Sequence, residues 1–222
     1  MIDLHTHSLL SDGVLLPSEL IRRAAVLGVK ALAITDHADH SNLEVILPQL
    51  IRLCGQVSTT DGIAVLPGIE LTYVPPGQIS FMAQRARQLG ARLVLVHGES
   101  IVEPVIPGTN RAAIEARVDI LAHPGLISED DVRLAAELGV SLEITARKGH
   151  CLANGRVARL ALKYKAKLVL NSDAHDIGDL ISPERARDVA LGAGLTLEQY
   201  ESILAHTWKL ISVTSSGQTI HA

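Results

Sequence analysis

The chain has few cysteines, few aromatic side chains and no long apolar run. Its two cysteines, Cys54 and Cys151, argue against a disulfide framework, and no secretory signal opens the chain, so we expect a cytoplasmic protein. Apolar stretches such as residues 93–96 are far shorter than the roughly 20 residues that span a bilayer, which excludes a membrane-embedded class. Aromatic residues make up only 2% and the net charge is −4, so extended nucleic acid is not an expected partner.

What the chain does have is a regular alternation of apolar and amphipathic segments, which is typical of parallel strands joined by crossover helices. With 222 residues, 47% of them apolar, it can form one large α/β domain, which we place at residues 1–211 before a polar tail at 212–222. Two architectures stay open, a barrel of about seven strand–helix units and an open doubly wound sheet. The predicted strands lie near residues 2–4, 31–35, 63–66, 93–96, 118–122, 140–144 and 168–170.

Helix boundaries are marked by capping residues. Pro17 begins a predicted helix that runs to Leu27 with Gly28 as its stop, and Gly139 ends another. Side chains of serine, threonine and asparagine accept hydrogen bonds from the first N–H groups of a helix. We therefore predict N-caps at Ser128, Asn154, Ser182 and Thr196.

Six of the ten histidines and several acidic residues stand in short clusters, each after a predicted strand. A single pair such as His5 and His7 is also explained by strand histidines bonded to backbone. Parallel strands, however, end at one mouth, where six imidazoles and three or four carboxylates would be untenable without divalent cations to offset and orient them. The clusters are His5-Thr6-His7 with Ser11-Asp12-Gly13, Thr35-Asp36-His37, Gly68-Ile69-Glu70, His97, Ala122-His123-Pro124 and Ser172-Asp173-Ala174-His175.

In their order, from residue 3 to residue 175, the clusters resemble the motifs of the PHP (polymerase and histidinol phosphatase) metal-dependent phosphoesterases. The resemblance implies an α/β fold, a distorted seven-stranded (β/α)7 barrel of PHP type. It also implies two to three divalent metal ions (zinc, manganese or iron) at the carboxyl ends of the strands. The implied ligands are His5, His7, Glu70 and Asp173 for the first ion, Glu70, His97 and His123 for the second, and Asp12, His37 and His175 for the third.

The resemblance also implies the chemistry. Two ions bridged by Glu70 would supply a metal-activated hydroxide to a phosphorus atom, and the third would assist the leaving alkoxide. Glu70, Asp173 and His175 are therefore the expected catalytic residues. Asp12 stands where some family members have histidine, which favours a weaker site or a harder metal there. Asp36 is expected to orient an imidazole rather than to bind a metal.

Basic side chains near the predicted mouth are candidate substrate contacts. Arg147, Lys148 and His150 follow a predicted strand, where a guanidinium could hold two phosphate oxygens, although a solvated basic loop is the alternative. The connection at 98–110 is long and rich in proline and glycine, which predicts a segment that covers the substrate. Arg111, which follows it, is either an anion contact or a helix residue facing solvent.

These observations favour a hydrolase that acts on a small phosphomonoester or phosphodiester, similar to histidinol phosphatase. A nuclease that acts on short oligonucleotides is an alternative, since relatives use the same metal cluster on nucleic acids. A non-catalytic metal-binding module is a third reading, although the complete ligand motifs count against it. The sequence leaves the physiological substrate, the metals and the oligomeric state open.

Overall fold

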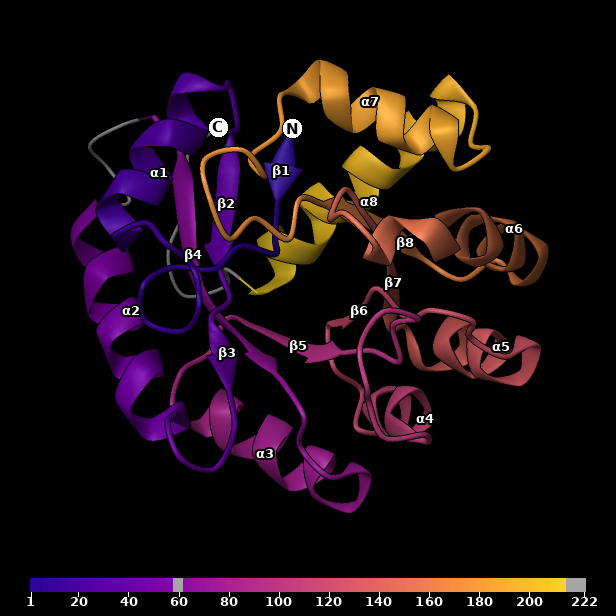
Figure 1. Ribbon diagram of the computed structural model, residues 1–222, viewed down its shortest axis with the longest axis horizontal. Coiled ribbons are helices and arrows are strands. Elements are labelled where there is room, and N and C mark those ends of the chain that lie inside the picture. The colour runs from indigo at the N-terminus through magenta and orange to yellow at the C-terminus, as the bar shows by residue number, and fades with distance from the viewer. Residues whose placement is uncertain (58–61, 215–222) are drawn as a thin grey trace.

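Parallel strands form the centre of the protein, which a computed structural model describes over residues 1–57 and 62–214 (Figure 1). Neighbours are joined in the order β1-β2-β4-β5-β6-β7-β8, and β3 pairs with β4. β2 and β3 are two pieces of one stave, because Ala31 pairs with Ala64 and His37 pairs with Glu70 along the same edge of β4. The strands are β1 (Ile2–Asp3), β2 (Ala31–Ile34), β3 (His37–Ala38), β4 (Ala64–Leu71), β5 (Leu93–His97), β6 (Ile120–Ala122), β7 (Ser141–Thr145) and β8 (Leu168–Asn171).

The sheet, with β2 and β3 counted as one strand, has seven strands and curls until the first and last strands meet. Just beyond the ends of β1 and β8, Thr6 forms a parallel bridge with Ala174. The Asp173 N–H donates a hydrogen bond to the His5 carbonyl at 2.9 Å. Of the two architectures that the sequence left open, the seven-stranded (β/α)7 barrel is therefore confirmed, in a nearly closed form.

Helices follow the strands and surround the barrel as a ring (Figure 1). Among the described residues, no helix is both long and apolar enough to cross a membrane. The helices are α1 (Pro17–Val26), α2 (Leu43–Val57), α3 (Pro76–Gln88), α4 (Thr109–Glu115), α5 (Glu129–Leu138), α6 (Asn154–Tyr164), α7 (Pro183–Gly192) and α8 (Leu197–Thr214), with a short 3-10 helix η1 (His150–Ala153) before α6.

Most of the predicted N-caps are confirmed. The side chains of Ser128, Ser182 and Thr196 each accept a hydrogen bond from a backbone N–H in the first turn of the helix that follows. The prediction for Asn154 is wrong, because this residue is already inside α6. Its amide binds both the N–H and the carbonyl of Thr145, and so ties the start of α6 to the end of β7.

The last helix extends past the predicted start of the polar tail. α8 continues to Thr214, whereas the tail was placed at residues 212–222, and residues 215–222 lie outside the described part of the chain. On α8, Ile211 is buried against Ile2 and Leu4 of the barrel interior. α8 therefore covers the amino-terminal end of the barrel and leaves the opposite end open.

Alternation along the strands decides which side chains enter the barrel. Successive side chains of a strand point to opposite faces, so every second residue shares the interior. In β5, Leu93 and Leu95 fill the lower interior and His97 follows on the same face. In β4, two-residue steps lead from Leu66 to Glu70. The interior thus changes from apolar to ligand-forming side chains at the carboxyl ends of the strands, where β/α barrels place their sites.

Candidate metal centre

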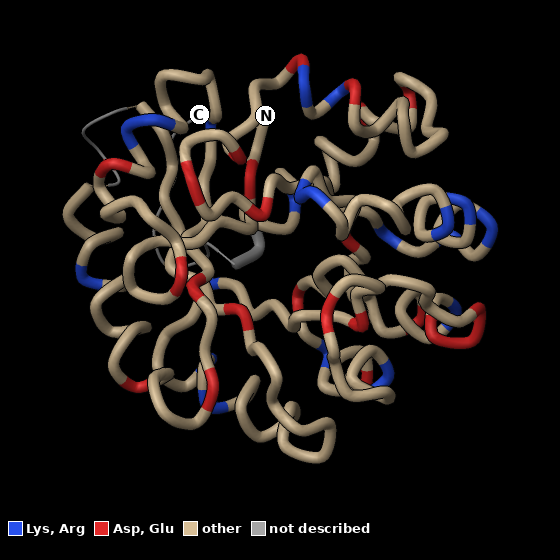
Figure 2. The backbone as a smooth tube through the Cα atoms, in the orientation of Figure 1, with Lys and Arg blue, Asp and Glu red and all other residues tan. Residues whose placement is uncertain are grey.

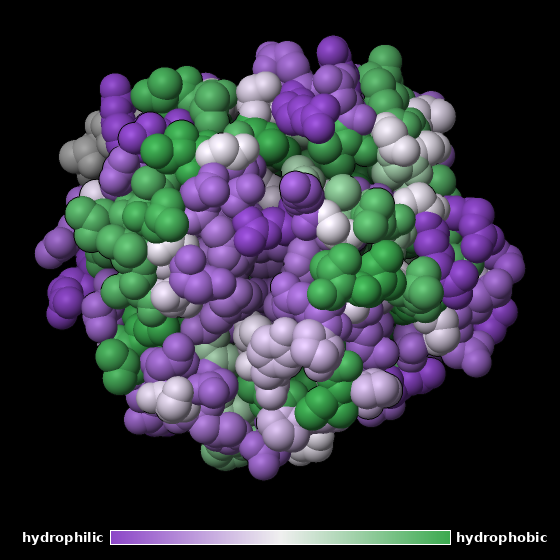
Figure 3. Space-filling view, viewed as in Figure 1, coloured by the Kyte–Doolittle hydropathy of each residue, from purple (hydrophilic) through white to green (hydrophobic). Residues whose placement is uncertain are grey.

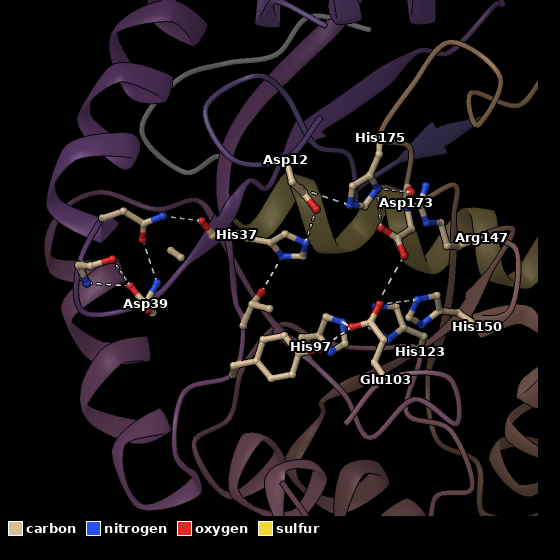
Figure 4. A pocket seen from close by; sticks show the side chains of 15 residues that line it. Asp12, His37, Asp39, His97, Glu103, His123, Arg147, His150, Asp173 and His175 are labelled. Atoms are coloured by element: carbon tan, nitrogen blue, oxygen red, sulfur yellow. Dashed lines mark hydrogen bonds and ion pairs between the residues drawn. The ribbon is translucent and has the colours of Figure 1, made fainter. Parts of the chain in front are cut away.

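Six of the nine predicted ligands line the open, carboxyl-terminal mouth of the barrel, namely Asp12, His37, His97, His123, Asp173 and His175 (Figure 4). The floor of this mouth is buried, with no residue more than 3% exposed, and consists of His5, His7, Glu70, His123 and Asp173. Eight of the nine fall into three overlapping groups whose ligand atoms lie within 4.8 Å of one another, and His97 is the ninth. The groups are His5, His7 and Glu70; His5, His123 and Asp173; and His7, Asp12, His37 and His175.

Imidazole nitrogens and carboxylate oxygens face one another across the floor. His5 Nε2 lies 3.3 Å from Glu70 Oε1 and 3.6 Å from Asp173 Oδ1. His7 Nε2 lies 3.3 Å from Asp173 Oδ1 and 3.6 Å from Glu70 Oε2, and His123 Nε2 lies 3.6 Å from both carboxylates. Two ligands that each bind one divalent ion at about 2.1 Å are separated by about 3.0–3.4 Å, depending on the geometry. The observed spacings are close to those of ligands that share ions.

Several atoms of this floor have no hydrogen-bond partner among the described residues, although they are shielded from water. They are His5 Nε2, His7 Nε2 and Glu70 Oε1, while Glu70 Oε2 lies 2.7 Å from His37 Nδ1. A buried polar group left without a partner costs about 1–3 kcal/mol, so a fold tolerates several together only where something else binds them. Imidazole nitrogens combined with carboxylate oxygens suit zinc, manganese or iron. The residues present therefore fit a multi-metal site.

Asp12 completes the outermost group. Its carboxylate lies 3.4 Å from His175 Nε2 and 3.6 Å from His37 Nε2, and its side chain is 56% exposed. Asp36 holds the turn that carries Asp12, because it accepts hydrogen bonds from the Ser8 N–H and from two serine hydroxyls of that turn. The expectation that Asp36 orients an imidazole is therefore corrected, since its carboxylate fixes backbone and hydroxyl groups instead.

Glu143 determines the direction in which His5 points. This β7 residue is fully buried, and its carboxylate accepts a hydrogen bond from His5 Nδ1 at 2.9 Å. It also accepts from Asn171 Nδ2 at 2.7 Å and from the His123 N–H at 3.0 Å. A ring held at Nδ1 presents its Nε2 lone pair to a metal. Sequence reasoning missed this role, and the available signal was a carboxylate inside an otherwise uncharged strand.

Charged neighbours alter the proton affinities of the imidazoles. Burial disfavours the charged form of His5, but the carboxylates around it, Glu143 and Glu70 foremost, raise its pKa well above the usual range. Burial also opposes the charge on His37, but the carboxylates of Glu70 and Asp12 raise its pKa to about 10. For His7 burial dominates and lowers the pKa to about 3. The carboxylates thus favour positive charge in the middle of the site.

His97 is paired with Glu103, which lies on the connection between β5 and α4. His97 Nε2 lies 2.9 Å from Glu103 Oε2, and its Nδ1 lies 3.2 Å from the Gly98 carbonyl. Glu103 also accepts a hydrogen bond from the Tyr73 hydroxyl at 3.0 Å, and its Oε1 lies 3.2 Å from His150 Nε2. The contacts with His150 and His97 hold the pKa of Glu103 well below its usual range. Sequence reasoning did not select Glu103.

A cleft of about 400 Å³ opens above the ligands and appears as a hydrophilic hollow in Figure 3. Of the predicted substrate contacts, Arg147 and His150 line this cleft. Lys148 is exposed and is not among the lining residues. Arg111 is not among them either, because its Nε lies 2.6 Å from Asp131 Oδ1 and links α4 to α5. The structure thus gives Arg111 a partner in the scaffold rather than a place in the cleft.

Left-handed backbone occurs at three residues of the cleft. Tyr73, His123 and Asp173 have φ values of 54°, 25° and 55°. Such conformations cost of order 1–3 kcal/mol each in non-glycine residues and persist where the surrounding structure enforces them. The fold therefore holds two of the predicted ligands in place against a local conformational cost.

Comparison with known proteins places the chain among relatives over most of its length. The model of the PHP domain family matches residues 3–124. An uncharacterized protein of Methanocaldococcus jannaschii is 46% identical over 92% of this chain and 94% of its own length. Ribonuclease P protein component 3 of Methanosarcina mazei is 31% identical, over 83% and 77%. A "probable phosphatase" of Shewanella sp. strain ANA-3 is 30% identical, over 85% and 81%.

A solved structure shares the barrel. Histidinol phosphate phosphatase from Lactococcus lactis, complexed with zinc, L-histidinol and phosphate, superposes with a TM-score of 0.61. The match covers 88% of this chain and 94% of that chain at 17% sequence identity. At this identity the comparison concerns the fold, and it agrees with the seven strands described above.

Proposed function

This chain belongs to the PHP domain family, and from that premise we propose that it is a metal-dependent phosphoesterase that hydrolyses a small phosphomonoester or phosphodiester. The observation that carries the proposal is the set of spacings of 3.3–3.6 Å between imidazole nitrogens and carboxylate oxygens in a buried floor beneath an open cleft. The phosphatase relative, and the zinc and phosphate of the histidinol phosphate phosphatase structure, support the same chemistry.

We assign two to three zinc, manganese or iron ions to this centre. Such ions lower the pKa of bound water and offset the charge of phosphate oxygens. Glu70 would bridge the first two ions, and Glu143 holds His5 in the orientation that a ligand needs. Following the resemblance to the family's motifs, we assign His5, His7, Glu70 and Asp173 to the first ion, Glu70, His97 and His123 to the second, and Asp12, His37 and His175 to the third. Eight of these nine side chains lie in the three groups of neighbouring ligand atoms described above.

Arg147 is the proposed phosphate contact. It is the only Lys or Arg among the described residues that line the cleft. Its ion pair with Asp179 uses one of the five N–H donors of the guanidinium, and the others can bind two phosphate oxygens together. Asp179 also accepts a hydrogen bond from the His175 N–H at 3.0 Å, so the guanidinium is fixed relative to a proposed ligand.

The charge around the cleft favours a small substrate over a polymer. Figure 2 shows acidic positions around the centre of this face and basic positions mainly on the outer helices. A long strand of nucleic acid needs several cations along its path, whereas one phosphate can be held by the ions and Arg147. The ribonuclease P relative nevertheless makes an oligonucleotide a necessary part of the test.

The test uses protein stripped of metal with a chelator, reloaded with zinc, manganese or iron, and analysed for bound ions. Turnover of histidinol phosphate, nucleoside monophosphates and a short oligonucleotide is then compared at two salt concentrations. We expect at least two ions per chain and hydrolysis of a phosphomonoester that depends weakly on salt. Glu70→Ala should reduce the rate far more than tenfold. This control would show that the turnover comes from the proposed metal centre and not from a contaminating enzyme.

Two results would overturn the proposal. The first is the absence of turnover of every phosphomonoester by protein that holds two or more ions. The second is a strong preference for the oligonucleotide with affinity that falls steeply as salt rises, because steep salt dependence signals the release of several counterions. The second result would replace the phosphatase by a nuclease.

A further inference from the structure

Glu103 reaches from its loop into the cleft, beside the strand-end ligands (Figure 4). We propose that Glu103 is a ligand of the ion assigned to His97 and His123, and that His150 and Tyr73 hold its carboxylate in position. This inference rests on the metal-dependent function proposed above. It adds a residue of the loop between β5 and α4 to the assigned ligand set.

The ring of His97 shows the hydrogen-bond pattern of a metal-bound histidine. Its Nδ1 lies 3.2 Å from the Gly98 carbonyl, which can only accept, so in the neutral ring Nδ1 carries the hydrogen. Nε2 then presents a lone pair, and at 2.9 Å it faces Glu103 Oε2, which also has only lone pairs. Two such atoms attract each other only when a proton or a cation lies between them.

The distance between these two atoms fits a shared ion. Two neighbouring ligands of an octahedral ion, each bound at about 2.1 Å, are about 3.0 Å apart. The 2.9 Å between His97 and Glu103 is close to this value. His5 provides the parallel within the floor, because its Nδ1 is bound to Glu143 at 2.9 Å while its Nε2 lies 3.3 Å from Glu70. His97 therefore faces Glu103 as His5 faces a proposed bridging ligand.

The neighbours of Glu103 hold its carboxylate and leave a lone pair for an ion. Tyr73 donates to Oε2 at 3.0 Å. His150 Nε2 lies 3.2 Å from Oε1, and His150 Nδ1 is buried without a partner among the described residues, so the hydrogen of this ring belongs on Nε2. The rings of His97 and His150 lie 4.4 Å and 4.2 Å from that of His123, which places Glu103 beside the second assigned ligand.

The loop that carries Glu103 is fixed at its base. The Glu99 carboxylate accepts hydrogen bonds from the N–H groups of Gly108 and Asn110 at 3.0 and 2.9 Å, and the Asn110 side chain accepts from the Glu99 N–H. Gly125 has a φ of 58° and packs so closely that a Cβ there would lie 1.9 Å from the Glu99 carbonyl oxygen. A loop closed in this way presents Glu103 with little further loss of conformational entropy.

Charge also favours a ligand over a contact for substrate alone. A bare carboxylate beside the place of a phosphate would repel it, whereas a divalent ion on His97 and His123 offsets that charge. Glu70 is shared between two assigned ions, so it gives the second ion only part of a carboxylate. Glu103 supplies the second ion with a carboxylate of its own.

The experiment is a zinc titration of metal-stripped protein against a chromogenic chelator, which resolves the successive equivalents. It compares wild type with Glu103→Gln and Glu103→Asp, and it uses Glu44→Gln as the control, since Glu44 is 65% exposed and pairs with Arg85 outside the cleft. Urea midpoints of the stripped proteins show whether each variant is folded. We expect Glu103→Gln to weaken one equivalent by at least tenfold, about 1.4 kcal/mol, and to leave the others unchanged.

The outcomes separate this proposal from the broader one. If wild-type protein binds fewer than two zinc ions, the proposed metal-dependent function is refuted, and the proposed role of Glu103 is refuted with it. Two or more ions in wild type, with every affinity kept within about threefold in both folded Glu103 variants, would overturn only the role of Glu103. A change in KM at unchanged zinc affinity would identify Glu103 as a substrate contact and would equally contradict a ligand.

Discussion

Replacing Glu143 with glutamine removes a negative charge and one acceptor from the buried support of His5 while the size of the side chain is kept. Glu143 Oε1 accepts from His5 Nδ1 and Asn171 Nδ2, and Oε2 accepts from the His123 N–H. In Glu143→Gln the amide oxygen can occupy the Oε1 position. The amide NH₂ group then meets the His123 N–H, and two donors cannot bond to each other.

The size of the effect follows from these contacts. A buried donor without an acceptor costs about 1–3 kcal/mol. The hydrogen bond to His5 changes from charge-assisted to neutral and loses about half of its strength, which makes Nε2 a poorer ligand. Loss of such a supporting residue lowers metal affinity about 10- to 100-fold, or about 1.4–2.8 kcal/mol. We expect this loss for the ion that His5 binds.

Zinc titration against a chelator measures the effect, and Glu137→Gln is the matched control, since Glu137 is exposed on α5. The urea midpoint of each stripped protein reports whether the fold is intact. If Glu143→Gln is folded and every zinc affinity lies within about threefold of wild type, the reasoning that Glu143 supports a metal ligand is refuted.

Three further predictions concern other parts of the molecule. Arg147→Ala should lower kcat/KM for a phosphomonoester roughly tenfold to a hundredfold at unchanged zinc content, because a charge-assisted contact of about 1.5–3 kcal/mol is lost, and unchanged steady-state kinetics would exclude the contact. Gly125→Ala should lower the Tm by at least about 4 °C, because alanine in the left-handed conformation costs about 1–2 kcal/mol and its Cβ would displace the Glu99 carbonyl. A calorimetric scan that matches the wild type would contradict this prediction. Burial raises the pKa of the Cys54 thiol from 9.0 to about 12, so at pH 8 its thiolate is about a thousandfold scarcer than in an ordinary cysteine. A thiol reagent should therefore modify the partly exposed Cys151 in native protein and both cysteines in denaturant. Rapid modification of Cys54 in native protein would contradict this prediction.

Features that depend on neighbouring residues in the sequence could be predicted. The N-caps at Ser128 and Ser182 are local hydrogen bonds, and a strand end follows from an apolar run and its period. Asn154 shows the limit of this reasoning. A capping residue bonds to the nearest backbone group that needs a partner, and at Asn154 that group belongs to Thr145 at the end of β7.

The supporting residues of the centre depend on contacts that a local pattern does not contain. Glu143 supports His5 because its side chain points from β7 into the barrel, where it meets His5, a residue 138 positions earlier in the sequence. Glu103 meets His97 because its loop is closed by Glu99 and packed against Gly125. Long-range pairing of this kind is set by the closed barrel, so the sequence could mark Glu143 as a carboxylate inside an uncharged strand but could not name its partners, and it did not distinguish Glu103 from a solvated carboxylate.

Because the barrel closes between β1 and β8, the metal centre can be completed only after β8 has been synthesised. Asp173, which lies just beyond the end of β8, leaves the ribosome about 170 residues after His5, or roughly 10–30 s later at about 5–20 residues per second. The Leu4 N–H finds Asn171 Oδ1, at 2.8 Å, only after β8 has been made. During that interval His5 and His7 exist without Asp173, one of the carboxylates of the floor. A nascent chain that ends before β8 therefore lacks the first ion's site, and metal capture there follows the completion of the barrel.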